Sequence, residues 1–239
     1  IYAIIYLLFL YAPILLLPLF AFNSSSIIAL PLSGFTIHWF ALLLETEALH
    51  EALYNSLLIA FTTAIVSTLL GIFAARAAAR YEFPGKRGIV GFIMVPLVLP
   101  EIIIGVALIV VLIQLGMPLS AWTVIIGHVL ICTPFSIAIL QSAFNNMDRS
   151  LEEASMDLGE NKVSTFFRVI LPLVTPGIIS SLLISFTISL DEFIIAFFLT
   201  GTDTPLPVYI WSQLRFPARL PAIMALGFIM VLLSLILLL

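Results

Sequence analysis

The stretch Asn145–Pro172, NNMDRSLEEASMDLGENKVSTFFRVILP, is the longest part of this chain in which charged residues are dense. Apolar segments long enough to cross a bilayer lie on both sides of it. This placement indicates a polar loop that joins two membrane spans and lies outside the membrane.

Composition decides the broad class of the chain. Of its 239 residues, 62% are hydrophobic and 9% are charged, with a mean hydropathy of +1.25, against roughly 45–50% apolar and 25% charged in soluble proteins. The apolar runs reach about 20 residues, enough for a helix to cross ~30 Å of hydrocarbon, and the alternation of a membrane barrel is absent. The expected fold class is therefore all-α, a polytopic membrane protein. The single cysteine, Cys132, excludes a disulfide within the chain and a cysteine metal cluster.

Six membrane spans are predicted, and together they make one membrane domain over residues 1–239. They lie near residues 2–22, 53–79, 89–115, 119–140, 174–199 and 221–239. The third contains Pro96, Pro100 and Glu101. Because proline removes a helical hydrogen bond and crowds the preceding turn, we expect this span to be kinked or broken near its middle. Residues 36–40 are predicted to form a short amphipathic helix at the membrane surface.

The basic residues predict the orientation of these spans. Seven of the nine flank the connection after the second span or lie in the one after the fourth: Arg76, Arg80, Lys86, Arg87, Arg149, Lys162 and Arg168. By the positive-inside rule, the face that carries them is cytoplasmic. Both termini would then be cytoplasmic as well, in a bacterial plasma membrane.

The polar loop is predicted to contain two short amphipathic helices. Ser150 and Glu153 have the spacing of a capping box, which would start the first helix. Its apolar stripe consists of Leu151, Ala154 and Leu158. Gly159 would end it in the left-handed conformation, and a second helix is expected over residues 162–170, ended by Pro172. Helices this short cannot form a core alone, so the loop either folds back as a solvated segment or docks on a partner protein.

The spacing within this loop resembles a known signature. Glu153-Ala154-Ser155, three residues, Gly159, nine residues and then Val169-Ile170-Leu171-Pro172 is similar to the EAA motif of permease subunits of binding-protein-dependent ABC importers. Ser155 replaces the second alanine and Val169 the isoleucine, both mild changes in size. The resemblance implies a type I importer permease in which loop 145–172 is a coupling element seated in a groove of an ATPase subunit. It assigns that contact to Glu153, Ala154 and Gly159, with Ser155 and Leu158 in the same segment.

Further motifs extend the resemblance over nearly the whole chain, to the second permease type of spermidine/putrescine importers. They are Phe22-Asn-Ser-Ser, Arg80-Tyr-Glu-Phe-Pro-Gly-Lys, Pro100-Glu101, Ser185-Phe-Thr-Ile-Ser-Leu-Asp-Glu and Thr200-Gly201. The resemblance implies half of a translocation pathway for a small cationic solute, paired with a second permease, two ATP-binding subunits and a periplasmic binding protein. ATP and Mg²⁺ would be bound by the ATP-binding subunits, and no cofactor is expected in this chain. Consistent with this, the sequence has no Gly-x-x-x-x-Gly-Lys-Ser/Thr phosphate loop.

Three carboxylates lie inside predicted spans, where an ionisable side chain costs several kcal/mol unless it faces a cavity or a partner. They are Glu101, Asp191 and Glu192. Neighbours on a helix point about 100° apart, so Asp191 and Glu192 cannot both face one narrow pathway, and one is expected to be a structural partner. No basic residue is found at a comparable depth, so a cationic substrate or a partner subunit is the expected counter-charge. A polyamine suits carboxylates set among aromatic side chains such as Trp211.

Other interpretations stay open at this point. Each of the three carboxylates could be a protonated packing residue, and His128 is expected to be a polar packing residue rather than a proton relay. No nucleophile elbow or zinc-binding helix motif occurs, so no enzymatic activity is expected. The alternative function is a self-powered secondary transporter or cation channel that uses Asp191 and Glu101, although the inverted repeats of such transporters are not evident. A third is a structural membrane subunit with no pathway of its own.

Overall fold

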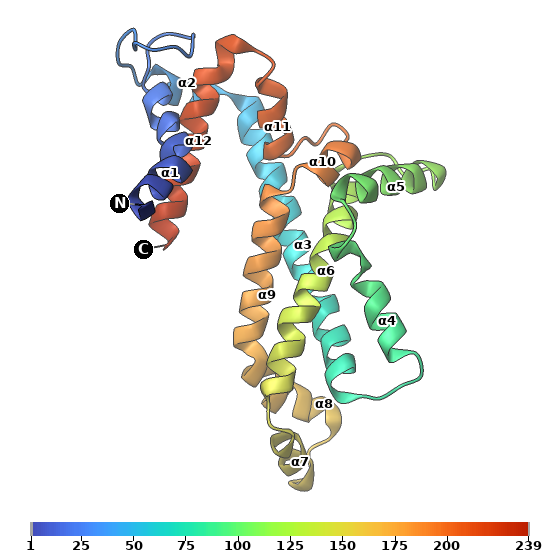
Figure 1. Cartoon of the computed structure of the whole chain (residues 1–239). Helices are drawn as coiled ribbons and strands as arrows, with labels where there is room; N and C mark the ends of the chain where they lie inside the picture. Colours follow the sequence, from blue (N-terminus) through green and yellow to red (C-terminus); the bar gives the residue numbers. More distant parts are fainter. Residues whose placement is uncertain (1, 239) are drawn as a thin grey trace. The chain divides into compact units, whose positions relative to one another are not determined.

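The computed structural model describes residues 2–238, and it contains no β-strand within that range. Its elements are α1 (Tyr2–Ala21), α2 (His38–Glu45), α3 (Glu47–Arg80), α4 (Lys86–Ile93), η1 (Val95–Leu97), α5 (Glu101–Gln114), α6 (Ala121–Asn146), α7 (Arg149–Asp157), α8 (Lys162–Thr165), η2 (Phe166–Ile170), α9 (Leu171–Asp191), α10 (Ile194–Leu199), α11 (Leu206–Gln213), η3 (Pro217–Arg219) and α12 (Leu220–Leu238) (Figure 1). The all-α fold class is confirmed.

Three helices are long and apolar enough to cross a membrane. They are α3, α6 and a continuous helix from Lys162 to Asp191. Shorter apolar helices cover Ile5–Ala21, Glu101–Gln114 and Pro217–Leu233, within the predicted first, third and sixth spans. Every predicted span therefore contains an apolar helix, whereas the count of six complete spans stays a prediction.

The chain divides into two compact units. Unit 1 consists of Ile1–Leu53 and Val208–Leu239, and unit 2 of Tyr54–Pro207. In unit 1, α1 and α12 pack against each other and run in opposite directions (Figure 1), and α2 packs on α12. The rings of Phe22, Phe40 and Phe228 meet there, with centroids of Phe22 4.9 Å from Phe40 and 5.7 Å from Phe228.

The short helix predicted over residues 36–40 is present as α2, His38–Glu45, whereas its place at the membrane surface stays a prediction. The segment before it turns back on itself, because Asn23 forms an isolated antiparallel bridge with Phe35. The buried Asn23 side chain accepts the Ser33 amide at 3.2 Å. Trp39 Nε1 donates to the Asn23 carbonyl at 2.7 Å, which fixes this segment to the start of α2.

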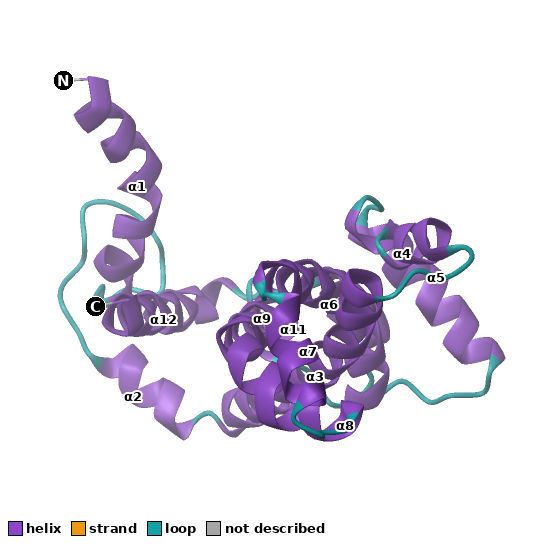
Figure 2. Cartoon of the chain, turned by 90° about the horizontal axis from the view of Figure 1, so that it is seen from below, coloured by secondary structure: helices purple, strands orange, loops and turns teal. Residues whose placement is uncertain are grey.

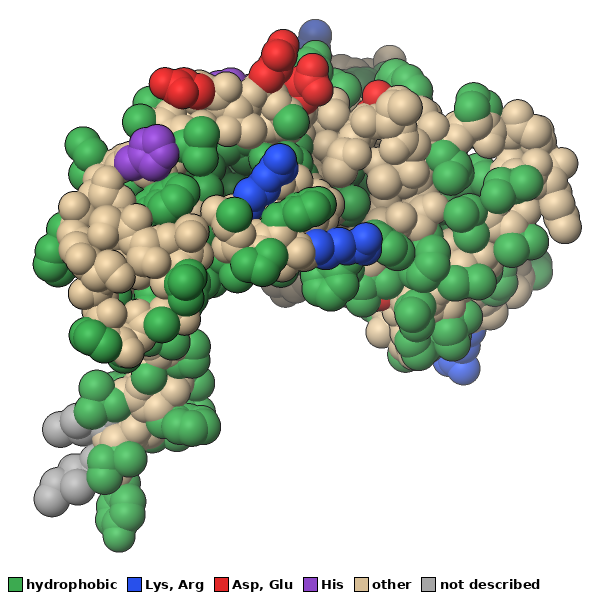
Figure 3. Space-filling view, turned by 90° about the horizontal axis from the view of Figure 1, so that it is seen from above, with side chains coloured by type: hydrophobic (Ala, Val, Ile, Leu, Met, Phe, Trp, Pro, Cys, Tyr) green, Lys and Arg blue, Asp and Glu red, His purple; other side chains and the backbone are tan. Residues whose placement is uncertain are grey.

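The junction of α2 and α3 is acidic. Glu45, Glu47 and Glu51 are all exposed there, and acidic side chains gather along one edge of the face drawn in Figure 3. This agrees with the sequence pattern, in which this part of the chain carries carboxylates and the basic residues are concentrated elsewhere.

Unit 2 is built on α3, α6 and α9, which lie side by side in Figures 1 and 2. Their buried apolar side chains form one cluster, made of Ile72, Ala75, Ile137, Leu140, Phe144, Ile170 and Val174. Two glycines allow the helices to approach closely. A Cβ added at Gly71 of α3 would lie 2.7 Å from Cβ of Ser136, and one at Gly177 of α9 would lie 2.7 Å from Cβ of Ala143. Small residues at helix contacts are the usual basis of packing in membranes.

A row of hydroxyl groups joins α9 to its neighbours. Ser181, Ser185 and Ser189 recur every fourth residue, on one face of the helix, and all three are buried. Ser181 is hydrogen-bonded to Thr68 of α3 at 3.0 Å, and Ser185 to Ser136 of α6 at 3.0 Å. Because polar groups left unpaired in hydrocarbon are costly, these bonds fix the rotation of α9 in the bundle.

Two predicted spans are interrupted, and only one interruption was expected. The third span is broken as predicted: α4 ends at Ile93, η1 contains Pro96, and α5 begins after Pro100. The fifth span was predicted to be continuous over residues 174–199, and this is wrong. Helix α9 ends at Asp191, Glu192 is extended with φ −70° and ψ 117°, and the chain resumes as α10.

Candidate functional site

The polar loop begins with a cap at Asp148. Its side chain accepts the amide of Ser150 at 2.9 Å, and α7 starts at Arg149. The predicted capping box of Ser150 and Glu153 is therefore wrong. Asp148 is an equally good cap and comes first in the chain, so Ser150 falls inside the first turn. The bond from the Ser150 amide lowers the pKa of the Asp148 carboxyl.

The end of α7 is the one predicted, at Gly159. Its φ is +93°, a left-handed conformation that favours glycine. The Gly159 amide donates to the Met156 carbonyl at 2.9 Å and the Glu160 amide to the Ser155 carbonyl at 3.2 Å, the pair of bonds of a Schellman motif. The Ser155 side chain is buried, and its hydroxyl lies 3.0 Å from that of Thr165. This contact joins α7 to α8.

The second helix of the loop does not end at Pro172. It is capped by Asn161, whose side chain accepts the Val163 and Ser164 amides at 3.0 and 2.9 Å. It then continues through the π-helical turn η2 into α9. Pro172 lies in the first turn of α9. The altered hydrogen bonding of the π turn before it accommodates the missing N–H and the proline ring. The predicted stop is wrong, and the polar loop is continuous with a membrane helix.

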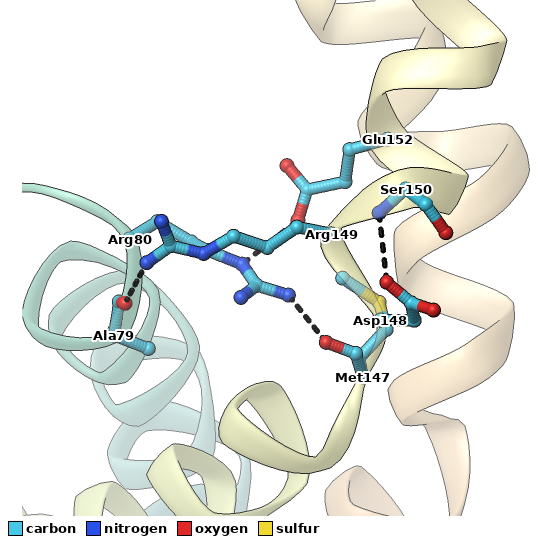
Figure 4. Close-up of polar contacts among 7 residues, drawn as sticks. All are labelled: Ala79, Arg80, Met147, Asp148, Arg149, Ser150 and Glu152. Carbon is cyan, nitrogen blue, oxygen red and sulfur yellow. Dashed lines mark hydrogen bonds and ion pairs between the residues drawn. The ribbon is translucent and has the colours of Figure 1, made fainter.

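Arg80, the last residue of α3, holds the start of α7 (Figure 4). Its Nε donates to Glu152 Oε1 at 2.9 Å and its Nη2 to the Met147 carbonyl at 3.0 Å. The two side chains of the ion pair are only 10% and 17% exposed. In return, Arg149 of α7 reaches the Ala79 carbonyl at 3.4 Å, at a helix C-terminus where a cation is favourable. The two basic connections therefore meet at one end of unit 2.

The polar loop carries several exposed large apolar side chains. They are Leu151, Met156 and Leu158 near α7, Val163 of α8 and Phe167 of η2, and Leu158 is the most open at 87%. Among the residues assigned by the EAA resemblance, Glu153, Ala154, Leu158 and Gly159 are exposed, whereas Ser155 points inward. Exposed apolar surface rimmed by charge is typical of a protein or membrane contact. Sequence reasoning found this surface but missed Asp148 and Arg80, which hold it in place.

The three carboxylates that lie inside predicted spans have different surroundings in the structure. Glu192 is 7% exposed and caps α10: Oε1 accepts the Ile195 amide at 3.0 Å and Oε2 the Ala196 amide at 3.1 Å. Asp191, the last residue of α9, is exposed, and so is Glu101, the first residue of α5. Glu192 is thus a structural residue, while Asp191 and Glu101 are open. The aromatic candidate, Trp211 of α11, belongs to unit 1 and is 47% exposed.

His128 of α6 completes the surroundings of Glu192. It is 1% exposed, its Nδ1 lies 2.7 Å from Ser189 Oγ, and its Nε2 lies 3.1 Å from Glu192 Oε2, in a contact not aligned as a hydrogen bond. The sequence analysis expected no basic residue at the depth of these carboxylates and treated His128 as a polar packing residue. The structure places this buried imidazole beside Glu192, at the break after α9.

Comparison with known proteins identifies the family. The family model described as "Binding-protein-dependent transport system inner membrane component" matches residues 67–239. This chain belongs to that family. The putrescine transport system permease protein PotI of Escherichia coli K12 is 37% identical over 215 residues, which cover 87% of this chain and 76% of the relative. The spermidine/putrescine transport system permease protein PotC of the same strain is 33% identical over 229 residues, which cover 95% of this chain and 86% of the relative.

Solved structures share the fold. A chain of a bacterial ABC transporter involved in alginate import matches with a TM-score of 0.77 and 17% identity, over 98% of this chain and 91% of that one. A chain of an amino acid ABC transporter matches with a TM-score of 0.61 and 20% identity, over 85% of this chain and 97% of that one. The family inferred from the EAA loop is confirmed: this is a multi-pass membrane permease subunit of a binding-protein-dependent ABC importer.

Proposed function

We propose that this permease forms half of the pathway of an ATP-driven importer for a polyamine such as putrescine or spermidine. One observation carries the proposal: a single helix of 30 residues runs from Lys162 to Asp191, about 45 Å at the helical rise. The exposed face of the polar loop lies at its beginning, and an exposed carboxylate lies at its end. A displacement of the loop is therefore passed along one rigid element to the other side of unit 2.

The loop is the part that would receive the force. Glu153, Ala154, Leu158 and Gly159 present an exposed surface to an ATP-binding subunit, while Ser155 joins α7 to α8 behind it. ATP and Mg²⁺ would bind in that partner. A second permease completes the pathway, and a periplasmic binding protein delivers the solute. The loop and both termini lie on the cytoplasmic face of a bacterial plasma membrane, as the basic residues favour.

The substrate class follows from charge. Asp191 is an exposed carboxylate at the end of an apolar helix, and Glu101 is a second one at the start of α5. A carboxylate at this depth needs a counter-charge, and a polyamine supplies cations separated by methylene groups. The names of the two relatives, which specify putrescine and spermidine, support the same class.

Disulfide cross-linking in the intact importer tests the docking surface. The chain has one native cysteine, Cys132, which is buried, so an introduced cysteine is the accessible one. Leu158→Cys should cross-link to a cysteine placed in the groove of the ATP-binding subunit. The matched control is Leu115→Cys, which is 69% exposed. Leu115 lies in the connection that leads to the start of α6, whereas the polar loop follows the end of α6. Cross-linking of Leu115→Cys but not of Leu158→Cys would reject the docking role.

Transport in proteoliposomes tests the energy source. The complex of permeases and ATP-binding subunits should take up putrescine from its binding protein only when ATP is supplied. Permease subunits alone should move no putrescine along a proton or sodium gradient. Gradient-driven uptake without the ATP-binding subunits would instead support the secondary-transporter alternative that uses Asp191 and Glu101.

A further inference from the structure

Two hollows of unit 2 meet at the junction of α3 with the α8–η2 segment. One is an apolar groove of about 540 Å³, whose lining includes Leu69, Phe73, Phe167 and Leu171. The other is a smaller polar pocket of about 200 Å³ beside α7. Arg76 and Lys162 line both, so the groove and the pocket adjoin at these two basic side chains.

The length and composition of α3 favour a groove at the depth of lipid chains and a pocket at the membrane surface. Helix α3 has 34 residues, about 51 Å at the helical rise, and so extends beyond ~30 Å of hydrocarbon. The C-terminal end of α3 carries the basic residues Arg76 and Arg80. Leu69, Phe73 and Arg76 are spaced by four and three residues, on one face of α3. That face therefore changes from apolar to basic where the helix leaves the hydrocarbon.

The polar pocket carries an excess of positive charge. Its lining contains four basic side chains, Arg76, Arg80, Arg149 and Lys162, and the two carboxylates of Glu152 and Glu153. Arg80 is neutralised by Glu152. Within residues 2–238, Arg76, Arg149 and Lys162 form no ion pair within 4.0 Å. They leave an uncompensated positive charge beside an apolar groove.

Arg76 is held in position for a ligand. Its guanidinium carbon lies 4.5 Å from the centroid of the Phe166 ring, a cation–π contact. Stacking on a ring occupies one face of the guanidinium and leaves its N–H groups, which lie in the guanidinium plane, available for a phosphate. Phe166 belongs to the π-helical turn that joins the polar loop to α9. A ligand on Arg76 would therefore contact the joint through which the proposed force passes.

We propose that this junction binds one anionic phospholipid, with its phosphate at Arg76 and Lys162 and an acyl chain in the groove over Leu69 and Phe73. A cationic pocket that adjoins an apolar groove matches the two parts of such a lipid in their order along the membrane normal. A soluble anion would use only the pocket and leave the groove unfilled. The site shares Glu153 with the residues proposed for docking and does not depend on which solute is transported.

Native mass spectrometry of the intact importer tests the site. The complex is purified and titrated with phosphatidylglycerol, with phosphatidylcholine as the zwitterionic reference. Arg76→Gln with Lys162→Gln should weaken phosphatidylglycerol binding roughly 30-fold, because each basic residue near an anionic lipid contributes about a factor of five. Lys86→Gln with Arg87→Gln is the matched control, since these residues lie on the same face but line neither hollow. It should leave the tightest-bound lipid in place.

Two further measurements separate the other occupants. Glycerol phosphate, which has the phosphate but no chain, should not displace the bound lipid, and Phe73→Ala should weaken lipid binding without altering the charge. Displacement by glycerol phosphate would assign the pocket to a free phosphate. Equal lipid loss in the two double variants, or loss of the ATP-binding subunits from the Arg76/Lys162 variant with lipid binding unchanged, would overturn the proposal.

Discussion

Asp191 and Glu192 are adjacent in the chain and have opposite surroundings. Glu192 is enclosed by two amides of α10 and by His128, while Asp191 is exposed at the end of α9. The break in the helix separates them, because the extended backbone at Glu192 turns its side chain back onto the first turn of α10. A carboxylate that serves the fold therefore lies next to one that is free to meet a substrate.

This difference predicts opposite effects of substitution. Asp191→Asn should lower putrescine uptake at least about tenfold, because contacts to a charged group contribute ~1.5–3 kcal/mol, with little change in thermal stability. Glu192→Ala leaves the amides of Ile195 and Ala196 without their acceptor and should lower stability by on the order of 3 kcal/mol. Uptake assays and thermal unfolding of the purified complex measure the two effects. Normal uptake by Asp191→Asn would move the substrate role to Glu101 or to the second permease.

Gly159 gives a second prediction, on coupling. Valine strains the left-handed backbone by about 1–2 kcal/mol, so Gly159→Val should disturb the end of α7 and reduce the putrescine transported per ATP hydrolysed. Gly116 is the matched control, since its φ is +69° and it too has open space around it, but it lies between α5 and α6. Gly116→Val should lose similar stability and keep normal coupling. The same transport-to-hydrolysis ratio in both variants would contradict a special role of Gly159.

At the scale of elements, the polar loop is held on two sides. Behind it, η2 continues directly into α9. In front of it, the Arg80 side chain donates hydrogen bonds to Glu152 in the first turn of α7 and to the carbonyl of Met147, which lies just before that helix. The loop is therefore held by both α3 and α9, and under the proposed coupling a force on α7 would reach both helices. The exposed residues Glu153, Ala154, Leu158 and Gly159 are those proposed to contact the ATP-binding subunit.

Arg80→Gln tests this clamp. The ion pair with Glu152 is mostly buried, so its loss should free α7, raise amide hydrogen exchange over residues 149–158 and reduce ATP-coupled uptake. Lys86→Gln removes the ion pair with Glu82, in which the Glu82 side chain is 91% exposed, and should have little effect because exposed pairs contribute about 0–1 kcal/mol. Unchanged exchange in Arg80→Gln would show that the helix continuity through η2 is sufficient.

At the scale of the whole molecule, basic and acidic residues gather in different parts of the chain. Seven of the nine basic residues lie in or beside the two connections that meet around Arg80. The junction of α2 and α3 in unit 1 carries exposed carboxylates instead. This asymmetry underlies the proposed orientation, with the loop in the cytoplasm, where the ATP-binding subunits would be.

Labelling with a membrane-impermeant maleimide checks that orientation. The native Cys132 is buried and should give little background. Gly88→Cys, in the open space of α4, should react only when the cytoplasmic face is made accessible. His50→Cys, exposed at the start of α3, should react in intact spheroplasts. Neither substitution changes a Lys, Arg, Asp or Glu, so the topology signal is kept, and the reverse labelling pattern would overturn the assignment.

Local chemistry was sufficient for much of this protein. Composition determined an all-α membrane protein, prolines 96 and 100 determined the break in the third span, and Gly159 determined the end of α7, because each effect acts within a few residues. The spacing of the EAA loop likewise identified the family.

The tertiary structure alone decided the contacts between distant residues. Arg80 is hydrogen-bonded to Glu152, 72 positions away in the sequence, and His128 to Ser189, 61 positions away. The fifth span breaks at Glu192 because packing places the capped α10 there, and the helix continues through Pro172 because a π turn relieves the proline; no pattern in the sequence predicted either.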